Sequence, residues 1–273
     1  MTIRFSNHND IPQIRNLMKI VFGDSDLYLD LFFKYKYNNN ALVLEYKEEI
    51  VSAAFLLPAQ YDGKTILYIY GCATLPQYRG IGFMKEILDL AYQYAIQQQY
   101  LGLCLVPATE QLFHYYEKLG FENHFYHQKH IFKWSEFNCT KDSNLLVETI
   151  NYEHYFEIRN SFLKSKNGIL WDINHLKLVE KEYVQQKGGF FTIQKGAEIT
   201  GFGFFYTSNF KTFIPELCSS QKKEVIAETF FNYLETNYIE ISTPENELCN
   251  GMIKWNPAFE QKPKSGYLAF SLE

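Results

Sequence analysis

The junction LPQYRGIGFMKEIL, Leu75–Leu88, constrains the fold of this chain more than any other segment. An apolar strand is predicted to end at Thr74, and a helix is predicted from Gly82 to about Gln98. Between them stand Gly80 and Gly82, in a chain otherwise rich in Phe and Tyr. A helix start presents unpaired N–H groups and the positive end of the helix dipole, and glycine lets a ligand approach them closely. The junction therefore predicts a cradle for a phosphate or pyrophosphate group.

Arg79 adds a fixed positive charge beside the glycines, and a guanidinium can bind a phosphate bidentately. The junction is not a Walker A loop, because no G-K-[ST] follows. It is not the dinucleotide fingerprint either, since the third glycine is missing and the layout is not a simple βαβ unit. A strand–helix turn that merely needs glycine would give the same local pattern, so both interpretations stay open at this point.

The length of 273 residues suits one large or two small domains. A net charge of −5 argues against a broad nucleic-acid-binding face. No apolar run approaches the ~18 residues that a membrane span needs, and the start MTIRFSNHND lacks the layout of a secretory signal. We therefore expect a cytoplasmic protein with no membrane and no nucleic acid among its partners.

The first half of the chain predicts the order β-α-α-β-β-β-α-β-α-β, a mixed α/β layout. Three consecutive strands form an antiparallel meander, with turns at Lys47–Glu49 and Asp62-Gly63. The expected strands are 2–5, 41–46, 50–60, 65–74, 101–106 and 121–134, and the expected helices are 10–22, 26–35, 82–98 and 110–119. This order predicts one domain over residues 1–134.

A polar segment, Ser135–Asn144, is interpreted as a linker to a second domain at residues 145–273. This half repeats the plan loosely, with hairpin turns in the two halves roughly 150 residues apart, as expected for a repeat of whole-domain size. Its expected helices are 151–163, 171–185 and 224–237, and its expected strands are 190–194, 199–206, 211–218, 238–242 and a closing strand at 266–272.

Two motifs resemble the GNAT superfamily of acyl-CoA N-acyltransferases. The run Leu75–Gly82 is similar to its acetyl-CoA motif Q/R-x-x-G-x-G/A, filled here by Gln77, Gly80 and Gly82. The run Tyr116–Phe121 resembles the second signature, one helix, one strand and one helix further on. The resemblance covers about Thr2–Trp134 and implies a GNAT-like domain, followed by a second, degenerate copy of the same fold.

The resemblance also implies which residues hold acetyl-CoA as a cosubstrate. The strand before the junction would run along the pantetheine, and the amides of the junction would hold the pyrophosphate. The matching positions are Ala73, Thr74 and Leu75 for the pantetheine and Gln77, Tyr78, Arg79, Gly80, Ile81, Gly82, Phe83 and Met84 for the pyrophosphate. The second half lacks both glycines where Lys222-Lys223 begins its helix, so no coenzyme site is expected there.

In the superfamily a tyrosine donates a proton to the leaving thiolate, and the resemblance places this role at Tyr116. A phenol of pKa near 10 is protonated at neutral pH and can donate. Tyr115 and Tyr116 both lie in an apolar helical stripe, so one of the two is expected only to pack. The usual basic glutamate has no counterpart between Thr65 and Gln77. Glu110, His114, the carboxylate of Glu273 and water remain as alternative bases.

Other polar residues give weaker indications. The five cysteines, at 72, 104, 139, 218 and 249, have no paired spacing, which favours buried thiols over a disulfide framework or a zinc site. No metal is expected at His124, His127 and His130, because no further ligand stands nearby in the sequence. Glu216 is interpreted as a solvated strand end or a substrate-facing carboxylate, and Trp171 and Trp255 as core or interface anchors.

The resemblance implies an acetyl-CoA-dependent N-acetyltransferase that acts on a primary amine of a small molecule or peptide. Asp24, Asp26 and Glu110 are acidic residues that attract an amine if they are not merely solvated. The missing glutamate motivates an alternative, a non-catalytic acyl-CoA-binding module. A third interpretation is an interaction scaffold made of the two halves. The sequence does not define the acceptor or the oligomeric state.

Overall fold

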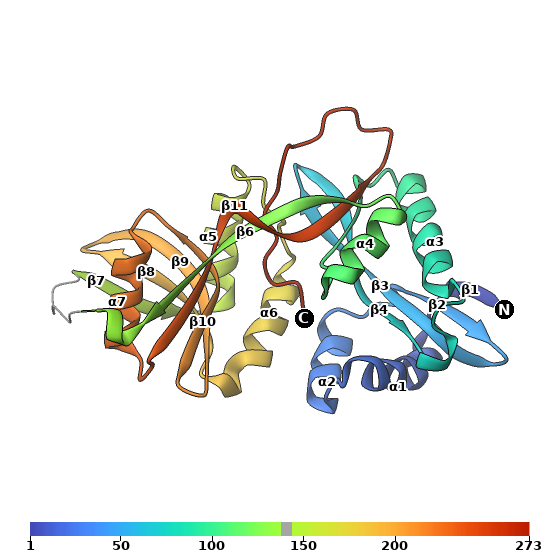
Figure 1. Cartoon of the computed structure of the whole chain (residues 1–273), viewed down its shortest axis with the longest axis horizontal. Helices are drawn as coiled ribbons and strands as arrows, with labels where there is room; N and C mark the ends of the chain where they lie inside the picture. The colour runs from blue at the N-terminus through green and yellow to red at the C-terminus, as the bar shows by residue number, and fades with distance from the viewer. Residues whose placement is uncertain (138–143, 273) are drawn as a thin grey trace.

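The first half folds in the predicted order, as described by a computed structural model that covers residues 1–137 and 144–272 (Figure 1). Short 3₁₀ turns lie at His8–Asp10, Pro76–Tyr78 and Trp134–Glu136. The strands are β1 (Thr2–Phe5), β2 (Ala41–Tyr46), β3 (Glu49–Tyr61), β4 (Lys64–Thr74), β5 (Gly102–Leu105) and β6 (Glu122–Lys133), and the helices are α1 (Ile11–Phe22), α2 (Asp26–Tyr35), α3 (Phe83–Gln97) and α4 (Glu110–Lys118).

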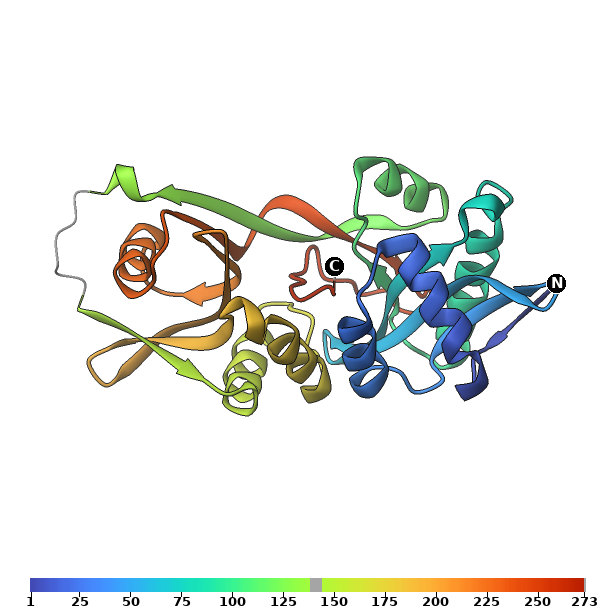
Figure 2. The same cartoon turned by 90° about the horizontal axis from the view of Figure 1, so that it is seen from below.

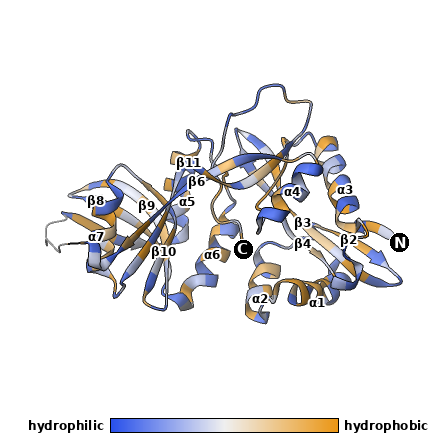
Figure 3. Cartoon of the chain, in the orientation of Figure 1, coloured by the Kyte–Doolittle hydropathy of each residue, from blue (hydrophilic) through white to orange (hydrophobic). Residues whose placement is uncertain are grey.

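Local sequence signals fix the ends of the first two helices. Gly23 ends α1 in the left-handed region at φ 76°, and the Ser25 side chain accepts a hydrogen bond from the Tyr28 N–H to cap α2. Helix α1 buries Ile14, Leu17 and Met18 at helical spacing. Hydrophobic residues likewise recur along α1, α2 and the central strands in Figure 3.

The second half contains a strand that the sequence did not reveal. β7 (Leu145–Ile150) follows the predicted linker directly, and residues 138–143 of that linker lie outside the described part of the chain. LLVETI shows little alternation, which explains the omission. The remaining elements are α5 (Tyr152–Leu163), α6 (Ile173–Tyr183), a 3₁₀ turn at Val184–Gln186, β8 (Gly189–Lys195), β9 (Glu198–Ser208), β10 (Lys211–Ser219), α7 (Lys223–Tyr233) and β11 (Tyr238–Trp255).

A single mixed sheet of 11 strands runs through both halves in the order β1-β2-β3-β4-β5-β11-β10-β9-β8-β7, with β6 paired to β11. β11 is parallel to β10 over Tyr238–Ile241 and antiparallel to β5 over Met252–Trp255. β6 follows β11 along most of its length, and this long ribbon joins the two lobes in Figures 1 and 2. The division into 1–134 and 145–273 therefore stays an interpretation, because β11 pairs with strands of both segments.

Two predicted strands need correction. The strand expected at 238–242 continues to Trp255, because β11 absorbs its polar middle as register shifts against β6 between Thr243 and Leu248. The closing strand expected at 266–272 does not form. Only Gly266 and Tyr267 make isolated bridges, and the rest of this tail bonds through its carbonyl groups to side chains.

The main hydrophobic core crosses from one half to the other. It includes Leu29 and Phe32 of α2 together with Trp171 and Leu176 of the second half, while a smaller core lies beneath α7. Trp171 and Trp255 are buried, as predicted for core anchors. At the start of α6, Asp172 forms an ion pair of 2.7 Å with Lys36, which directly follows α2. The two lobes are thus packed against each other as well as joined by the ribbon.

The interpretation of Glu216 as a solvated or substrate-facing carboxylate is wrong. Its side chain is 0% exposed and forms an ion pair of 2.7 Å with Arg159, which is equally buried. Tyr155 also donates a hydrogen bond to it, at 2.5 Å. A buried carboxylate requires such partners, and no local pattern reveals them because Arg159 lies 57 residues away.

Candidate active site

Strands β4 and β5 separate soon after they meet. They pair in parallel only at Leu67–Leu103 and Tyr68–Cys104, and β4 then continues to Thr74 while β5 ends at Leu105. On the side that faces β5, residues 69–74 therefore have no strand partner among the described residues. Backbone N–H and C=O groups that are not paired within the fold need other partners, and a ligand that carries amide groups can supply them.

A β-bulge in β4 lies at this separation. Ala54 of β3 stands opposite two residues, Gly71 and Cys72, between the pairs Ala53–Ala73 and Phe55–Tyr70. Gly71 has φ +63°, and a Cβ there would lie 2.9 Å from Cε of Met18. Gly71 is not among the predicted site residues, although a lone glycine inside an apolar strand signals a bulge or a close approach. The bulge turns the end of β4 away from regular pairing.

The junction after β4 forms an open turn at the start of α3. Gly80 has φ +80° and Gly82 has φ +103°, and a Cβ at either would meet nothing within 4 Å. Gly82 precedes α3 without any side-chain cap, and the first bond into the helix is from Glu86 N–H to Gly82 C=O at 3.2 Å. The first amides of α3 are thus free of intrahelical partners in an uncrowded, exposed setting, which suits an anion.

The predicted coenzyme residues fall into three groups by exposure. Those with exposed positions are Gln77, Arg79, Gly80, Ile81 and Gly82. Those partly buried are Thr74, Tyr78 and Met84, and those with buried side chains are Ala73, Leu75 and Phe83. These three buried residues can offer a ligand only their backbone groups, because their side chains pack in the core. Arg79 folds back toward the strand, and its Nε donates to the Thr74 carbonyl at 3.1 Å.

Tyr116 lies across the separation from β4, on α4. Its side chain is 6% exposed, and its hydroxyl lies close enough to the Cys72 thiol beside the bulge for each group to shift the pKa of the other. Burial raises the pKa of Tyr116 well above 10, and the neighbouring Cys72 raises it further. Burial also raises the pKa of Cys72 to about 11, so this sulfur is a neutral thiol near pH 7. Tyr116 therefore carries a proton throughout the neutral range, directly at the gap between the strands.

Tyr115 differs from its neighbour. It is partly exposed, and its ring packs edge-on against Tyr116 at 5.2 Å. Burial raises the pKa of Tyr115 as well, and the nearby Cys72 raises it further. Of the two tyrosines in the helical stripe, Tyr116 is the buried one.

The candidate bases do not gather at Tyr116. Glu110 and His114 are exposed on α4, and His114 instead lies 3.3 Å from Glu117. At 100° per residue, His114 faces about 200° away from Tyr116 on the helix. Glu273 lies outside the described residues.

The C-terminal tail enters the space between the lobes and reaches the candidate site. Trp171 Nε1 donates to Ala269 C=O at 2.7 Å, and His175 Nε2 lies 2.7 Å from Phe270 C=O. The Tyr68 hydroxyl then donates to Ser271 C=O. Tyr68 is the last residue of β4 that pairs with β5, and its hydroxyl is close enough to Tyr116 to raise the pKa of that phenol. Sequence reasoning missed this route, because the tail was read as a strand.

A family model described as an acetyltransferase (GNAT) domain matches residues 2–123. No curated protein sequence matches the chain significantly. In the part of the chain that the structure describes, no helix is long and apolar enough to span a membrane.

Several solved structures share the fold of nearly the whole chain. A GCN5-related N-acetyltransferase from Anabaena variabilis has a TM-score of 0.75 and 14% identity, covering 92% of this chain and 72% of the other. Eis1 from Mycobacterium abscessus has a TM-score of 0.71 and 8% identity, covering 93% and 74%. A tandem GNAT protein from the clavulanic acid biosynthesis pathway has a TM-score of 0.55 and 10% identity, covering 92% and 97%.

Proposed function

We propose that the protein transfers an acetyl group from acetyl-CoA to a primary amine, because an acetyltransferase (GNAT) domain model matches residues 2–123. The observation that carries this proposal is the proximity of Tyr116 to Cys72 at the gap between β4 and β5, on the strand that leads into the open turn at Gly80 and Gly82. The edge of β4, the turn and α3 follow one another along the chain, as one extended ligand requires.

Acetyl-CoA would lie along the unpaired edge of β4, with its pyrophosphate on the turn. Residues 73–75 offer the backbone groups of the β4 edge, and residues 77–84 offer the amides at the start of α3. The open space above Gly80 and Gly82 fits the close approach of a phosphate. Arg79 is the positive charge nearest in sequence to these amides.

Tyr116 is the proposed general acid. Acetyl transfer forms a C–N bond from the amine nitrogen to the thioester carbonyl carbon and breaks the C–S bond. The departing sulfur carries a negative charge, and the Tyr116 hydroxyl supplies its proton. The amine must lose one proton to become neutral before attack and a second one as the amide forms, and water can accept both. Cys72 holds the hydroxyl toward β4, and its raised pKa keeps it from acting as a nucleophile near neutral pH.

The test is direct binding of acetyl-CoA together with thiol release over a panel of amines, aminoglycosides, amino acids and peptides. We expect micromolar to millimolar binding by isothermal titration and turnover of at least one amine class. Gly82→Glu places a side chain and a negative charge in the open turn and should abolish binding. Absence of binding at millimolar acetyl-CoA would refute the proposal.

A non-catalytic acyl-CoA-binding module is the second candidate, favoured by one observation. The described part of β4 carries no carboxylate at the gap, so no basic side chain is provided from that strand. This alternative predicts coenzyme binding without thiol release for any amine, and no effect of Tyr116→Phe on any measured property except stability.

A further inference from the structure

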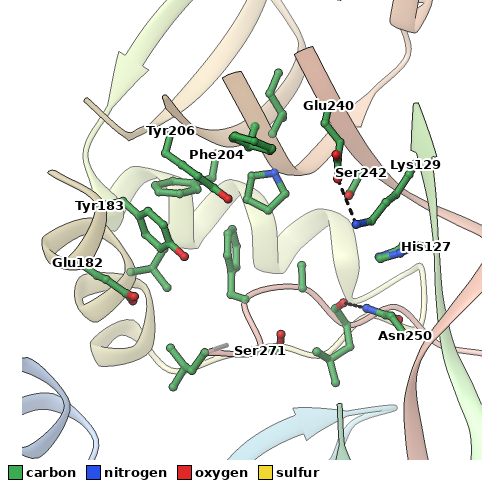
Figure 4. A pocket seen from close by; sticks show the side chains of 18 residues that line it. His127, Lys129, Glu182, Tyr183, Phe204, Tyr206, Glu240, Ser242, Asn250 and Ser271 are labelled. Atoms are coloured by element: carbon green, nitrogen blue, oxygen red, sulfur yellow. Dashed lines mark hydrogen bonds and ion pairs between the residues drawn. The ribbon is translucent and has the colours of Figure 1, made fainter. Parts of the chain in front are cut away.

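A cavity of about 330 Å³ opens between the second half, the ribbon and the C-terminal tail (Figure 4). That volume lies at the lower end of the roughly 300–1,000 Å³ range of small-molecule sites. Aromatic side chains from three elements form one wall, with the Tyr183 and Tyr206 rings 4.7 Å apart and the Tyr206 and Phe213 rings stacked at 5.1 Å. Aromatic faces of this kind attract cations as well as apolar groups.

The cavity is connected to the proposed reaction centre through the tail. Ser271 lines the cavity, and its carbonyl accepts the hydrogen bond of Tyr68. The Tyr68 hydroxyl in turn neighbours Tyr116. A molecule in the cavity therefore lies beside the tail residue that contacts Tyr68, and Tyr68 in turn neighbours the proposed acid.

The charged groups of the cavity are not balanced. Glu240 is neutralised by an ion pair of 3.1 Å with Lys129, visible in Figure 4. Glu182, at the other side of the cavity in Figure 4, makes no hydrogen bond or ion pair that involves the described residues. Burial, and then the nearby Asp24, raise the pKa of Glu182 to about 7. Glu182 is thus a partly buried carboxylate that lacks a cation.

Asp24, in the first half of the chain, is a second partly buried carboxylate without a cationic partner among the described residues. It lies between α1 and α2, and its Oδ2 is buried without a hydrogen-bond partner among the described residues. Burial raises the pKa of Asp24. The hydroxyls of Tyr28 and Tyr70, 2.6 Å apart, lie near both carboxylates, and no cationic group contributes to the pKa of either acid. A buried acceptor atom without a partner is costly, which points to a partner supplied from outside.

We propose that this cavity binds the acceptor, and that the acceptor is an amine with a second positive charge held between Glu182, which lines the cavity, and Asp24, which neighbours Glu182 but does not line the cavity. The inference rests on the proposed function, because the amino group that is not held by the carboxylates is the one that receives the acetyl group near Tyr116. The two carboxylates come from different lobes, so a bound dication satisfies both and bridges α6 to the loop before α2. The aromatic wall then packs against the carbon chain that joins the two amino groups.

The test uses three probes of equal length: 1,5-diaminopentane, pentylamine and 5-aminopentanoate. They carry a second group that is cationic, neutral and anionic, respectively. Each is titrated into the intact protein with saturating coenzyme A, which cannot transfer an acetyl group. We expect the diamine to bind at least tenfold more tightly than pentylamine, because charge-assisted hydrogen bonds are stronger than neutral ones. The amino acid should bind more weakly than either, because the carboxylates repel its anionic group.

Glu182→Gln and Asp24→Asn should each lower the affinity for the diamine about tenfold or more while preserving side-chain shape. Glu180→Gln is the matched control on the same helix, because Glu180 pairs with Lys181 and does not line the cavity. It should change nothing. Circular dichroism and the thermal midpoint establish that each variant folds.

Two results would overturn the inference. One is equal affinity for the diamine and pentylamine, or no binding of any probe at tens of millimolar. The other is unchanged diamine affinity in both carboxylate variants. Thiol release is measured separately. Diamine binding without turnover of any amine would refute the proposed function and leave the cavity as a dication site. Turnover of pentylamine and the diamine with equal efficiency would support the proposed function and refute the inference about the second charge.

Discussion

Tyr116→Phe is the most informative single substitution, because the structure separates the chemical role of the hydroxyl from the packing of the ring. The ring packs against Tyr115 at 5.2 Å and Phe121 at 5.6 Å, and phenylalanine keeps both contacts. The change removes only the hydroxyl, which neighbours the Cys72 thiol. Even a full hydrogen bond contributes only about 0.5–1.5 kcal/mol net, so the thermal midpoint should fall by no more than a few degrees.

The effect on turnover should be far larger than the effect on stability. A positioned general acid contributes about 10²–10⁴-fold to a proton-transfer step. We expect kcat to fall about 100-fold, equivalent to about 2.7 kcal/mol, with the Kd for acetyl-CoA unchanged. Burial holds the pKa of Tyr116 above 10, so the Tyr116 hydroxyl keeps its proton from pH 7 to pH 9. The pH profiles of kcat for the wild type and for Tyr116→Phe should therefore have the same shape across that range.

The assay is continuous detection of free coenzyme A thiol, paired with titration of acetyl-CoA into each variant. Tyr115→Phe is the control, since it removes the neighbouring hydroxyl from the more exposed of the two tyrosines. A kcat for Tyr116→Phe within about twofold of wild type would refute the assignment of the acid. A larger loss in Tyr115→Phe than in Tyr116→Phe would show that the wrong tyrosine had been chosen.

Three further predictions test the remainder of the structure. Gly82→Ala should lower acetyl-CoA affinity about tenfold or more by titration, because φ +103° strains any residue with a Cβ; unchanged affinity would exclude the turn as the pyrophosphate site. Arg159→Met should lower the free energy of unfolding by about 3–5 kcal/mol in urea, since it leaves the Glu216 carboxylate buried and unpaired, and adding Glu216→Leu should restore most of the loss. Cys72 should react with iodoacetamide roughly 100-fold more slowly than a free thiol at pH 7.5, as its pKa of about 11 implies, when its modified peptide is followed by mass spectrometry.

The sequence predicted those features of the candidate site that depend on neighbouring residues. The open turn at Gly80 and Gly82 arises from their own backbone angles and the helix that follows, so its geometry could be inferred locally, while its role in binding a coenzyme stays a prediction. The contact of Ser271 with Tyr68 could not, because the two residues are 203 positions apart and a carbonyl group accepts the bond. Every residue type has a backbone carbonyl group, so no sequence pattern could mark position 271 as the acceptor.

The same distinction explains the errors in the second half. Glu216 sits in an apolar strand, where a carboxylate normally signals a solvated end, and only its distant partner Arg159 makes burial tolerable. In β11 the polar residues between Thr243 and Leu248 resembled a strand end, although β6 supports the chain across them. Pairing with a distant strand overrode the local pattern in this case.

The continuity of the sheet gives the degenerate second half a physical reason to persist. β5 has β4 on one edge and β11 on the other, so the strand that borders the proposed coenzyme gap is held in place by a segment near the end of the chain. Residues 1–134 alone would leave that edge of β5 unpaired and would remove α6, which carries Glu182. The second half, which has no matching glycine turn, therefore still completes the sheet of the first half and forms most of the cavity beside it. We therefore expect changes in the second half to alter the choice of acceptor and changes at the turn in the first half to alter coenzyme binding.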